Sequence, residues 1–174
     1  MALIYTRKAE TTDIDDMMAI IDEAKALLKA DGSTQWQDGH PDKELLLADI
    51  KKGFARVLIV DGQVAGTATL MSTPDPCYKE IEGAWQDNED PYATIHRIAI
   101  SAKFRGMKLS KFFFSNLISD AYAQGLHHMR IDTHKMNQRM QNLVKEFGFE
   151  YTGIIYVEDA VDGKRLAYEL NMLK

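Results

Sequence analysis

The sequence predicts an α+β fold in which a mixed, mostly antiparallel central sheet is flanked by helices. Alternating apolar segments flank Asp61-Gly62 and again Asp162-Gly163, and this pattern is typical of antiparallel hairpins. Between the two hairpins, segments 93–101 and 128–134 have strand character and enclose a helical pattern. A strand–helix–strand unit of this kind is expected to be a right-handed parallel crossover. The sheet should therefore contain one central parallel strand pair among antiparallel ones.

The first half of the chain supplies two helices and a hairpin. A capping box at Thr12 and Asp15 precedes apolar residues at helical spacing, and Asp31-Gly32 ends that helix. Pro41 suits the first turn of a second helix, which Gly53 ends. The expected elements are strand 2–8, helix 14–28, a helix to residue 50, and strands 54–60 and 63–71.

The second half begins with a long irregular segment, 72–92, which contains three prolines. Loops of this length in compact proteins are usually functional or mobile. Gly125 and Gly148 are expected to end the two helices that follow. The remaining elements are strand 93–101, helix 108–124, strand 128–134, helix 137–147 and strands 151–158 and 165–173. No linker or repeat interrupts this order, so residues 1–174 are expected to form one domain.

Composition excludes several classes of protein. The net charge of −5 argues against non-specific nucleic-acid binding, and no apolar segment is long enough for a membrane span. Cys77 is the sole cysteine, so an internal disulfide is impossible and a reducing compartment fits best. We read Cys77 as an incidental thiol. These features predict a cytoplasmic protein without nucleic-acid or membrane partners; the oligomeric state stays open, with a homodimer among the expectations.

Basic residues gather where the helix after strand 93–101 begins. Lys103, Arg105, Lys108 and Lys111 lie there, and no acidic residue occurs in 101–119. Cations at a helix N-terminus are unfavourable by themselves, whereas a bound anion would be stabilised by both the side chains and the free backbone N–H groups. The cluster therefore indicates a phosphate site, with a solvated basic surface as the alternative.

Three segments resemble the GNAT superfamily of acyl-CoA-dependent N-acetyltransferases. Residues 105–110, Arg-Gly-Met-Lys-Leu-Ser, match the family's pyrophosphate loop, and 137–149 match its Asn…Gly-Phe segment. Residues 95–100 are similar to the strand before that loop, and the order of elements agrees along the whole chain. Two departures stand out: Lys108 and Ser110 replace small loop residues, and Val144 replaces a tyrosine thought to protonate the leaving thiolate.

The resemblance implies an enzyme that uses acetyl-CoA as cosubstrate and a primary amine of a small molecule or peptide as acceptor. The pantetheine arm is expected to pair with the strand before the loop. The residues that the resemblance assigns to acetyl-CoA are Ile98, Ala99, Ile100, Arg105, Gly106, Met107, Lys108, Leu109, Ser110 and Asn137.

Acyl transfer from a thioester to an amine needs a proton acceptor more than a proton donor. A thiol has a pKa near 8.5 and leaves readily as thiolate, whereas an alkyl amine has a pKa near 10 and arrives protonated. His96 and His134 are the candidate bases, with a water chain as the alternative. For His96, a structural role as a hydrogen-bonded, half-buried side chain is at least as well supported by the sequence as a role as base. No metal is expected, because neither histidine has a second ligand at metal-binding spacing within its element.

Other readings remain at this point. Trp36, Gln37 and His40 lie in a connection that borders the acceptor groove in this fold, although Trp36 is also a candidate packing anchor. Acidic residues of the long loop form either a solvated edge or an attractive field for a cationic amine: Glu80, Glu82, Asp87, Glu89 and Asp90. The missing tyrosine favours one rival, a non-catalytic acyl-CoA-binding or sensing domain. A phosphotransferase fits poorly, since residues 105–111 lack the P-loop pattern.

Overall fold

The computed structural model describes residues 1–88, 90–158 and 160–174 and contains an eight-stranded sheet in the order β1-β2-β3-β5-β6-β8-β7-β4. The helices are α1 (Ile14–Ala30), α2 (Lys43–Lys51), α3 (Leu109–Ala123) and α4 (Gln138–Glu146). The strands are β1 (Ile4–Lys8), β2 (Ala55–Val60), β3 (Gln63–Met71), β4 (Glu82–Gly83), β5 (Tyr92–Ile100), β6 (His128–Thr133), β7 (Glu150–Tyr156) and β8 (Lys164–Asn171).

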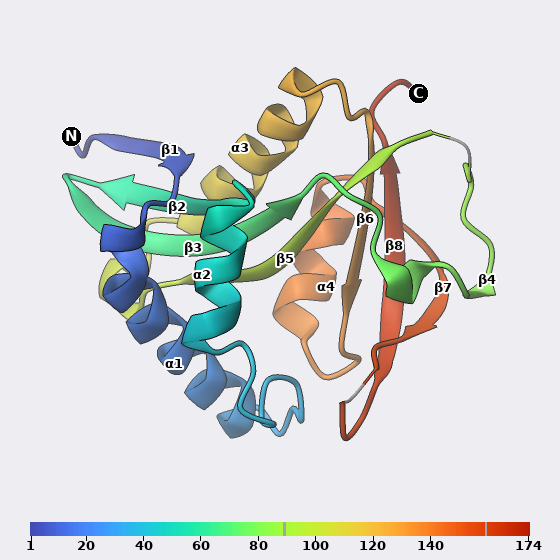
Figure 1. Ribbon diagram of the computed structural model, residues 1–174, viewed down its shortest axis with the longest axis horizontal. Helices are drawn as coiled ribbons and strands as arrows, with labels where there is room; N and C mark the ends of the chain where they lie inside the picture. Colours follow the sequence, from blue (N-terminus) through green and yellow to red (C-terminus); the bar gives the residue numbers. More distant parts are fainter. Residues whose placement is uncertain (89, 159) are drawn as a thin grey trace.

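Strand pairing confirms the predicted fold class. β5 and β6 run parallel, and the other pairs in the described part of the sheet are antiparallel. Asp61 and Gly62 have φ values of 47° and 82°, as the two-residue hairpin turn between β2 and β3 requires. Helix α3 connects β5 to β6, so the strand–helix–strand unit lies at the centre of the sheet (Figure 1).

Helices cover both faces of the sheet. Side chains alternate along β2, so Val57 and Ile59 pack with α1 and α2 in one apolar cluster. Leu58 and Val60 belong to a second cluster, formed with α3 and α4 on the opposite face. Figure 1 shows the two helix pairs on either side of the strands. All residues of β2 are buried because both of its faces are covered.

Two helix starts differ from prediction. Before α1, the capping contact lies two residues earlier, at a 3₁₀ turn (Thr11–Asp13): the Asp13 carboxylate accepts from the Glu10 N–H at 2.8 Å and pairs with Arg7 at 2.7 Å. Pro41 precedes α2 instead of entering its first turn, and Asp42 caps the helix by accepting from the Leu45 N–H at 2.8 Å. At α2 a nearby carboxylate thus satisfies an N–H group of the first turn, whereas α1 follows the 3₁₀ turn without a side-chain cap of its own.

The segment predicted as irregular contains structure of its own. It holds a 3₁₀ turn (Pro76–Tyr78) and the edge strand β4. Tyr78 and Trp85 are buried and form a third apolar cluster with Tyr92 and Ile155. Aromatic packing therefore fixes this segment against the sheet. Glu89, which the sequence placed in its acidic edge, lies outside the described residues.

No helix in the described part of the chain is long and apolar enough to cross a membrane.

Candidate active site

A cleft of about 970 Å³ opens where β5 and β6 separate. The two strands pair only from Tyr92–Thr94 to His128–Arg130 and then part, although β5 continues to Ile100. Residues 95–100 of β5 line one wall, and the end of β6 with the start of α4 lines the other. Parting parallel strands expose backbone groups that a sheet would otherwise pair, so the cleft can hydrogen-bond an extended ligand.

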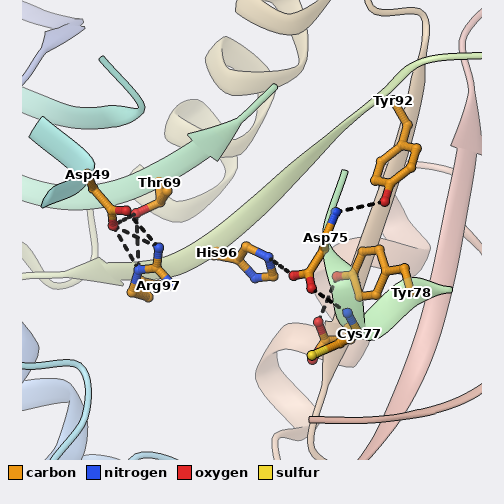
Figure 2. A network of polar contacts seen from close by, with 9 residues as sticks. Asp49, Thr69, Asp75, Cys77, Tyr78, Tyr92, His96 and Arg97 are labelled. Carbon is orange, nitrogen blue, oxygen red and sulfur yellow. Dashed lines mark hydrogen bonds and ion pairs between the residues drawn. The ribbon is translucent and has the colours of Figure 1, made fainter. Parts of the chain in front are cut away.

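A bulge interrupts β5 inside this cleft. Thr69 of β3 faces His96 and Thr67 faces Ala99, so one extra β5 residue lies between the paired positions. Arg97 has a φ of 53°, which is uncommon for a side-chain-bearing residue. Its guanidinium is held by Asp49 of α2 through two hydrogen bonds of 2.9 Å, and Figure 2 shows this contact beside Thr69. The helix thereby holds the strand in its bulged shape.

The turn before α3 has the conformation of an anion site. Gly106 and Lys108 have φ values of 85° and 56°. Among the residues that the structure describes, none accepts a hydrogen bond from the backbone N–H of Gly106, Lys108, Leu109 or Ser110. Such N–H groups at a helix start attract phosphate.

The predicted loop residues divide by position. Arg105 and Ser110 line the cleft, together with Lys111, whose ammonium pairs with Glu146 of α4. The cleft wall does not include the residues between them, 106–109, and Leu109 is instead buried in the core. Of the strand residues predicted to contact the cosubstrate, Ile98, Ala99 and Ile100 all line the cleft.

Asn137 caps α4. Its Oδ1 accepts from the Met140 N–H at 3.2 Å, and its Nδ2 reaches Gln35 at 3.4 Å. It also lines the cleft, so its side chain is available to a ligand. Val144, two turns further along α4, is fully buried in the core.

The two candidate histidines are in different environments. His96 lines the cleft, and its Nε2 lies 2.9 Å from Asp75 Oδ2 (Figure 2). His134 does not line the cleft and is 2% exposed. Its Nδ1 accepts from the Met136 N–H at 3.1 Å, and its Nε2 lies 2.7 Å from Asp162 Oδ2. Both ring nitrogens of His134 are thus engaged, whereas His96 has one nitrogen left for chemistry.

Asp75 is the residue that sequence reasoning missed. Burial alone would raise the pKa of its carboxyl, but hydrogen bonds from His96 and from the Cys77 N–H hold that pKa below the usual value. The only sequence signal was its place between Pro74 and Pro76 in a loop of unusual length. No spacing rule connects it with His96.

The neighbouring polar groups are unsuited to nucleophilic attack. Burial raises the pKa of the Cys77 thiol, and the carboxylates of Asp75 and Asp132 add to the rise. Burial likewise raises the pKa of Tyr78 well above its usual value, and its hydroxyl donates to Asp132 at 2.7 Å. Both groups therefore stay protonated at neutral pH, in agreement with the reading of Cys77 as an incidental thiol.

Acidic and basic groups both line the cleft. Asp38, Asp132 and Glu158 line it with Asp75, and the basic residues of the wall are Arg97, Arg105, Lys111, Arg139 and Arg165. Trp36 packs against the apolar cluster under α1, as expected of a packing anchor, and it also lines the cleft. His40 lies in the wall, whereas the Gln37 side chain is bonded to the carbonyl of Lys25.

A separate group of possible metal ligands lies outside the cleft. Ligand atoms of Asp87, Asp90 and His128 are within 4.8 Å of one another, and the His128 Nε2 is 3.0 Å from Asp90. None of the three lines the cleft. A reaction in the cleft would therefore not use them.

Comparisons with known proteins agree with this geometry. The model of the acetyltransferase (GNAT) family matches residues 21–149. A GNAT-family acetyltransferase structure from Streptococcus agalactiae is 36% identical, with a TM-score of 0.88 over 97% of this chain and 95% of that one.

Two more distant structures share the fold. The yncA protein from Salmonella typhimurium, solved with its cofactor acetyl-CoA, is 18% identical, with a TM-score of 0.66 over 97% of this chain and 94% of that one. The ribosomal-protein-S18-alanine N-acetyltransferase from Escherichia coli is 15% identical, with a TM-score of 0.68 over 98% and 94%. The search of curated protein sequences found no match.

Proposed function

This chain belongs to the acetyltransferase (GNAT) family, and we propose that it transfers the acetyl group of acetyl-CoA to a primary amine of a small molecule or peptide. The observation that carries the proposal is the cleft between β5 and β6, with a bulged strand on one side and, before α3, a turn whose backbone N–H groups are free. We also propose that residues 1–174 act as one domain in the cytoplasm; the single cysteine, Cys77, supports a reducing compartment.

In our proposal, acetyl-CoA binds along the wall that β5 provides. The pyrophosphate lies on the free N–H groups of Gly106 and of residues 108–110, with Arg105 and Lys111 nearby. The pantetheine arm pairs with the backbone of Ile98–Ile100, and Asn137 faces it from α4. The bulge supports this placement because it turns strand N–H groups away from the neighbouring strand.

The reaction then needs three events. The nitrogen of the neutral amine attacks the thioester carbonyl carbon, and backbone N–H groups near the bulge stabilise the oxyanion that forms. The carbon–sulfur bond breaks and CoA leaves as thiolate, which needs no acid because a thiol has a pKa near 8.5. His96 accepts the proton that the amine loses. We no longer assign a catalytic role to His134, because both of its ring nitrogens are engaged.

The acceptor end of the cleft favours a cationic amine. Among the described residues, the carboxylates of Asp38, Asp75, Asp132 and Glu158 line the cleft, and the Arg165 guanidinium is influenced by Asp38 and Asp132. An ammonium group would be attracted there and would lose one proton to solvent; the neutral amine then attacks, and His96 accepts its second proton. This charge balance supports an acceptor without an acidic group next to the reacting amine.

Calorimetry with acetyl-CoA and turnover over a panel of primary amines test the proposal. We expect binding and the release of free CoA that depends on the amine. Binding without turnover on any amine would favour the alternative, a non-catalytic acyl-CoA-sensing domain. That alternative arises because Val144 replaces the tyrosine that the family resemblance would place there.

Substitution of the two histidines tests the base. We expect kcat/KM for a good amine to rise with pH, with an inflection that reports the side chain that accepts the proton. His96→Gln should remove the inflection and lower kcat/KM by about 10²-fold or more, whereas His134→Gln should keep it. An unchanged pH profile in His96→Gln would mean that water or the substrate itself accepts the proton.

A further inference from the structure

We infer that Asp75 is a positioning residue for His96: its carboxylate fixes the imidazole with the proton on Nε2 and turns the lone pair of Nδ1 toward the cleft. The inference rests on the proposed function in that His96 accepts the proton of the amine. The positioning itself is a property of the free protein and can be measured without turnover.

The contact between the two side chains is direct. His96 Nε2 and Asp75 Oδ2 are 2.9 Å apart, and the two side chains are only 18% and 15% exposed. A partly buried hydrogen bond to a charged group is stronger than its neutral equivalent. In the part of the chain that the structure describes, no group within hydrogen-bonding distance faces His96 Nδ1. Because His96 lines the cleft, Nδ1 is the nitrogen left for a substrate.

The rest of the loop holds Asp75 in place. Its Oδ1 accepts from the Cys77 N–H at 2.8 Å, and its own N–H donates to the Tyr92 hydroxyl at 2.9 Å (Figure 2). Pro74 and Pro76 on either side restrict the backbone further. Oδ1 of Asp75 thus caps the 3₁₀ turn, and Oδ2 is left to orient the imidazole of His96.

The charge of Asp75 determines which nitrogen of His96 carries the proton. Hydrogen bonds from His96 and Cys77 outweigh the effect of burial and lower the pKa of the Asp75 carboxyl, so it is ionised at neutral pH. An ionised carboxylate only accepts hydrogen bonds. His96 Nε2 must therefore donate, and Nδ1 of the neutral ring carries a lone pair.

Other charged groups around the imidazole leave this arrangement intact. The ring of Tyr78 lies 6.2 Å from that of His96, but its hydroxyl donates to Asp132 of β6. The guanidinium of Arg97, the next residue on β5, is held by Asp49 of α2. When Nδ1 takes up a proton, the nearby carboxylate of Asp75 stabilises the imidazolium that forms.

The competing explanation is that Asp75 only fastens the loop. Asp75→Asn and Tyr92→Phe separate the two roles. The first variant keeps an oxygen for the Cys77 N–H but presents an amide N–H₂ to His96, which then has to accept through Nε2 and carry its proton on Nδ1. The second removes a loop contact and leaves the carboxylate unchanged.

Nitrogen-15 NMR of the histidine ring, above the pH at which it titrates, reads the tautomer directly. We expect the Nε2–H form in the wild type and in Tyr92→Phe, and the Nδ1–H form in Asp75→Asn. We also expect Asp75→Asn to lower kcat/KM for the amine by about 10²-fold, with the KM for acetyl-CoA within about twofold of the wild type.

Three results would overturn the inference: an Nδ1–H tautomer in the wild type, an unchanged tautomer in Asp75→Asn, or an equal loss of rate in Tyr92→Phe. The proposed function can fail independently. If the wild type acetylates no amine but has the Nε2–H tautomer that Asp75→Asn inverts, the positioning of His96 stands and the transferase proposal does not.

Discussion

At the scale of single residues, Lys108 is unfavourable at its position in both backbone conformation and charge. It has a φ of 56°, where a side-chain-bearing residue is strained by about 1 kcal/mol or more, and it precedes α3 at the positive end of the helix dipole. Both effects are unfavourable in the free protein. A bound phosphate would change the sign of the second effect, because the ammonium would then face an anion.

Lys108→Gly is therefore expected to change stability and binding in opposite directions. The free energy of unfolding should rise by about 0.5 to 1 kcal/mol, since the left-handed strain and the dipole repulsion outweigh the added freedom of the unfolded chain. Affinity for CoA should fall by about 3- to 10-fold because one cation near the pyrophosphate is lost. Urea unfolding and calorimetry measure the two effects.

Lys108→Asn serves as the matched control for this prediction. Asparagine tolerates the left-handed region better than lysine and has no charge. It should lose CoA affinity to the same degree. Undiminished affinity in both variants would show that the Lys108 ammonium does not act on the cosubstrate.

At the scale of elements, the bulge of β5 depends on α2. Asp49 of α2 is nearly buried and binds Arg97, which lies at the bulge, and also accepts from the Thr69 hydroxyl at 2.7 Å. A buried ion pair adds little net stability, yet the loss of one partner is costly because the other charge remains without compensation. The pair therefore specifies the shape of the strand.

Asp49→Asn should lower both stability and turnover. We expect a loss of about 2 to 4 kcal/mol in the free energy of unfolding, together with a fall in kcat as the bulge relaxes. Asp120→Asn is the control, because Asp120 pairs with the buried Arg56 at 2.7 Å and neither residue lines the cleft. It should lose stability but keep kcat. Equal kcat in the two variants at a temperature where both are folded would contradict the role given to α2.

Prediction from sequence succeeded for features that depend on residues close together in the chain. The hairpins, the order of elements and the Asn137 cap follow from local patterns, and all appear in the structure. The Asp75–His96 contact joins residues 21 positions apart on a loop and a strand, so no local pattern specifies it. For the same reason, the engagement of both His134 nitrogens could not be predicted, since Asp162 comes from the β7–β8 turn.

At the scale of the whole molecule, carboxylates with lowered pKa make stability depend on pH. The hydrogen bond from Arg7 lowers the pKa of Asp13. For Asp120, burial acts in the opposite direction, but hydrogen bonds from Arg56 and Gln124 lower the pKa overall. Each group binds its proton more weakly in the folded than in the unfolded chain, so stability is present above the unfolded pKa and is lost as pH falls.

The urea midpoint should therefore be constant from about pH 7 to 5 and fall below about pH 4, near the reference pKa of aspartate and continuing through the folded values. Asp120→Asn should have a lower midpoint at neutral pH and a shallower fall in acid. A midpoint that stays constant to pH 3, or rises, would contradict these assignments.

The central claim is that acetyl-CoA occupies the cleft between β5 and β6 with its thioester beside His96. A crystal structure of the protein with acetyl-CoA tests it most directly. We expect the pyrophosphate on the N–H groups of Gly106 and of residues 108–110, the pantetheine along Ile98–Ile100, and room for one amine between the thioester carbon and His96 Nδ1. A thioester bound away from β5, or separated from His96 by other side chains, would contradict the account.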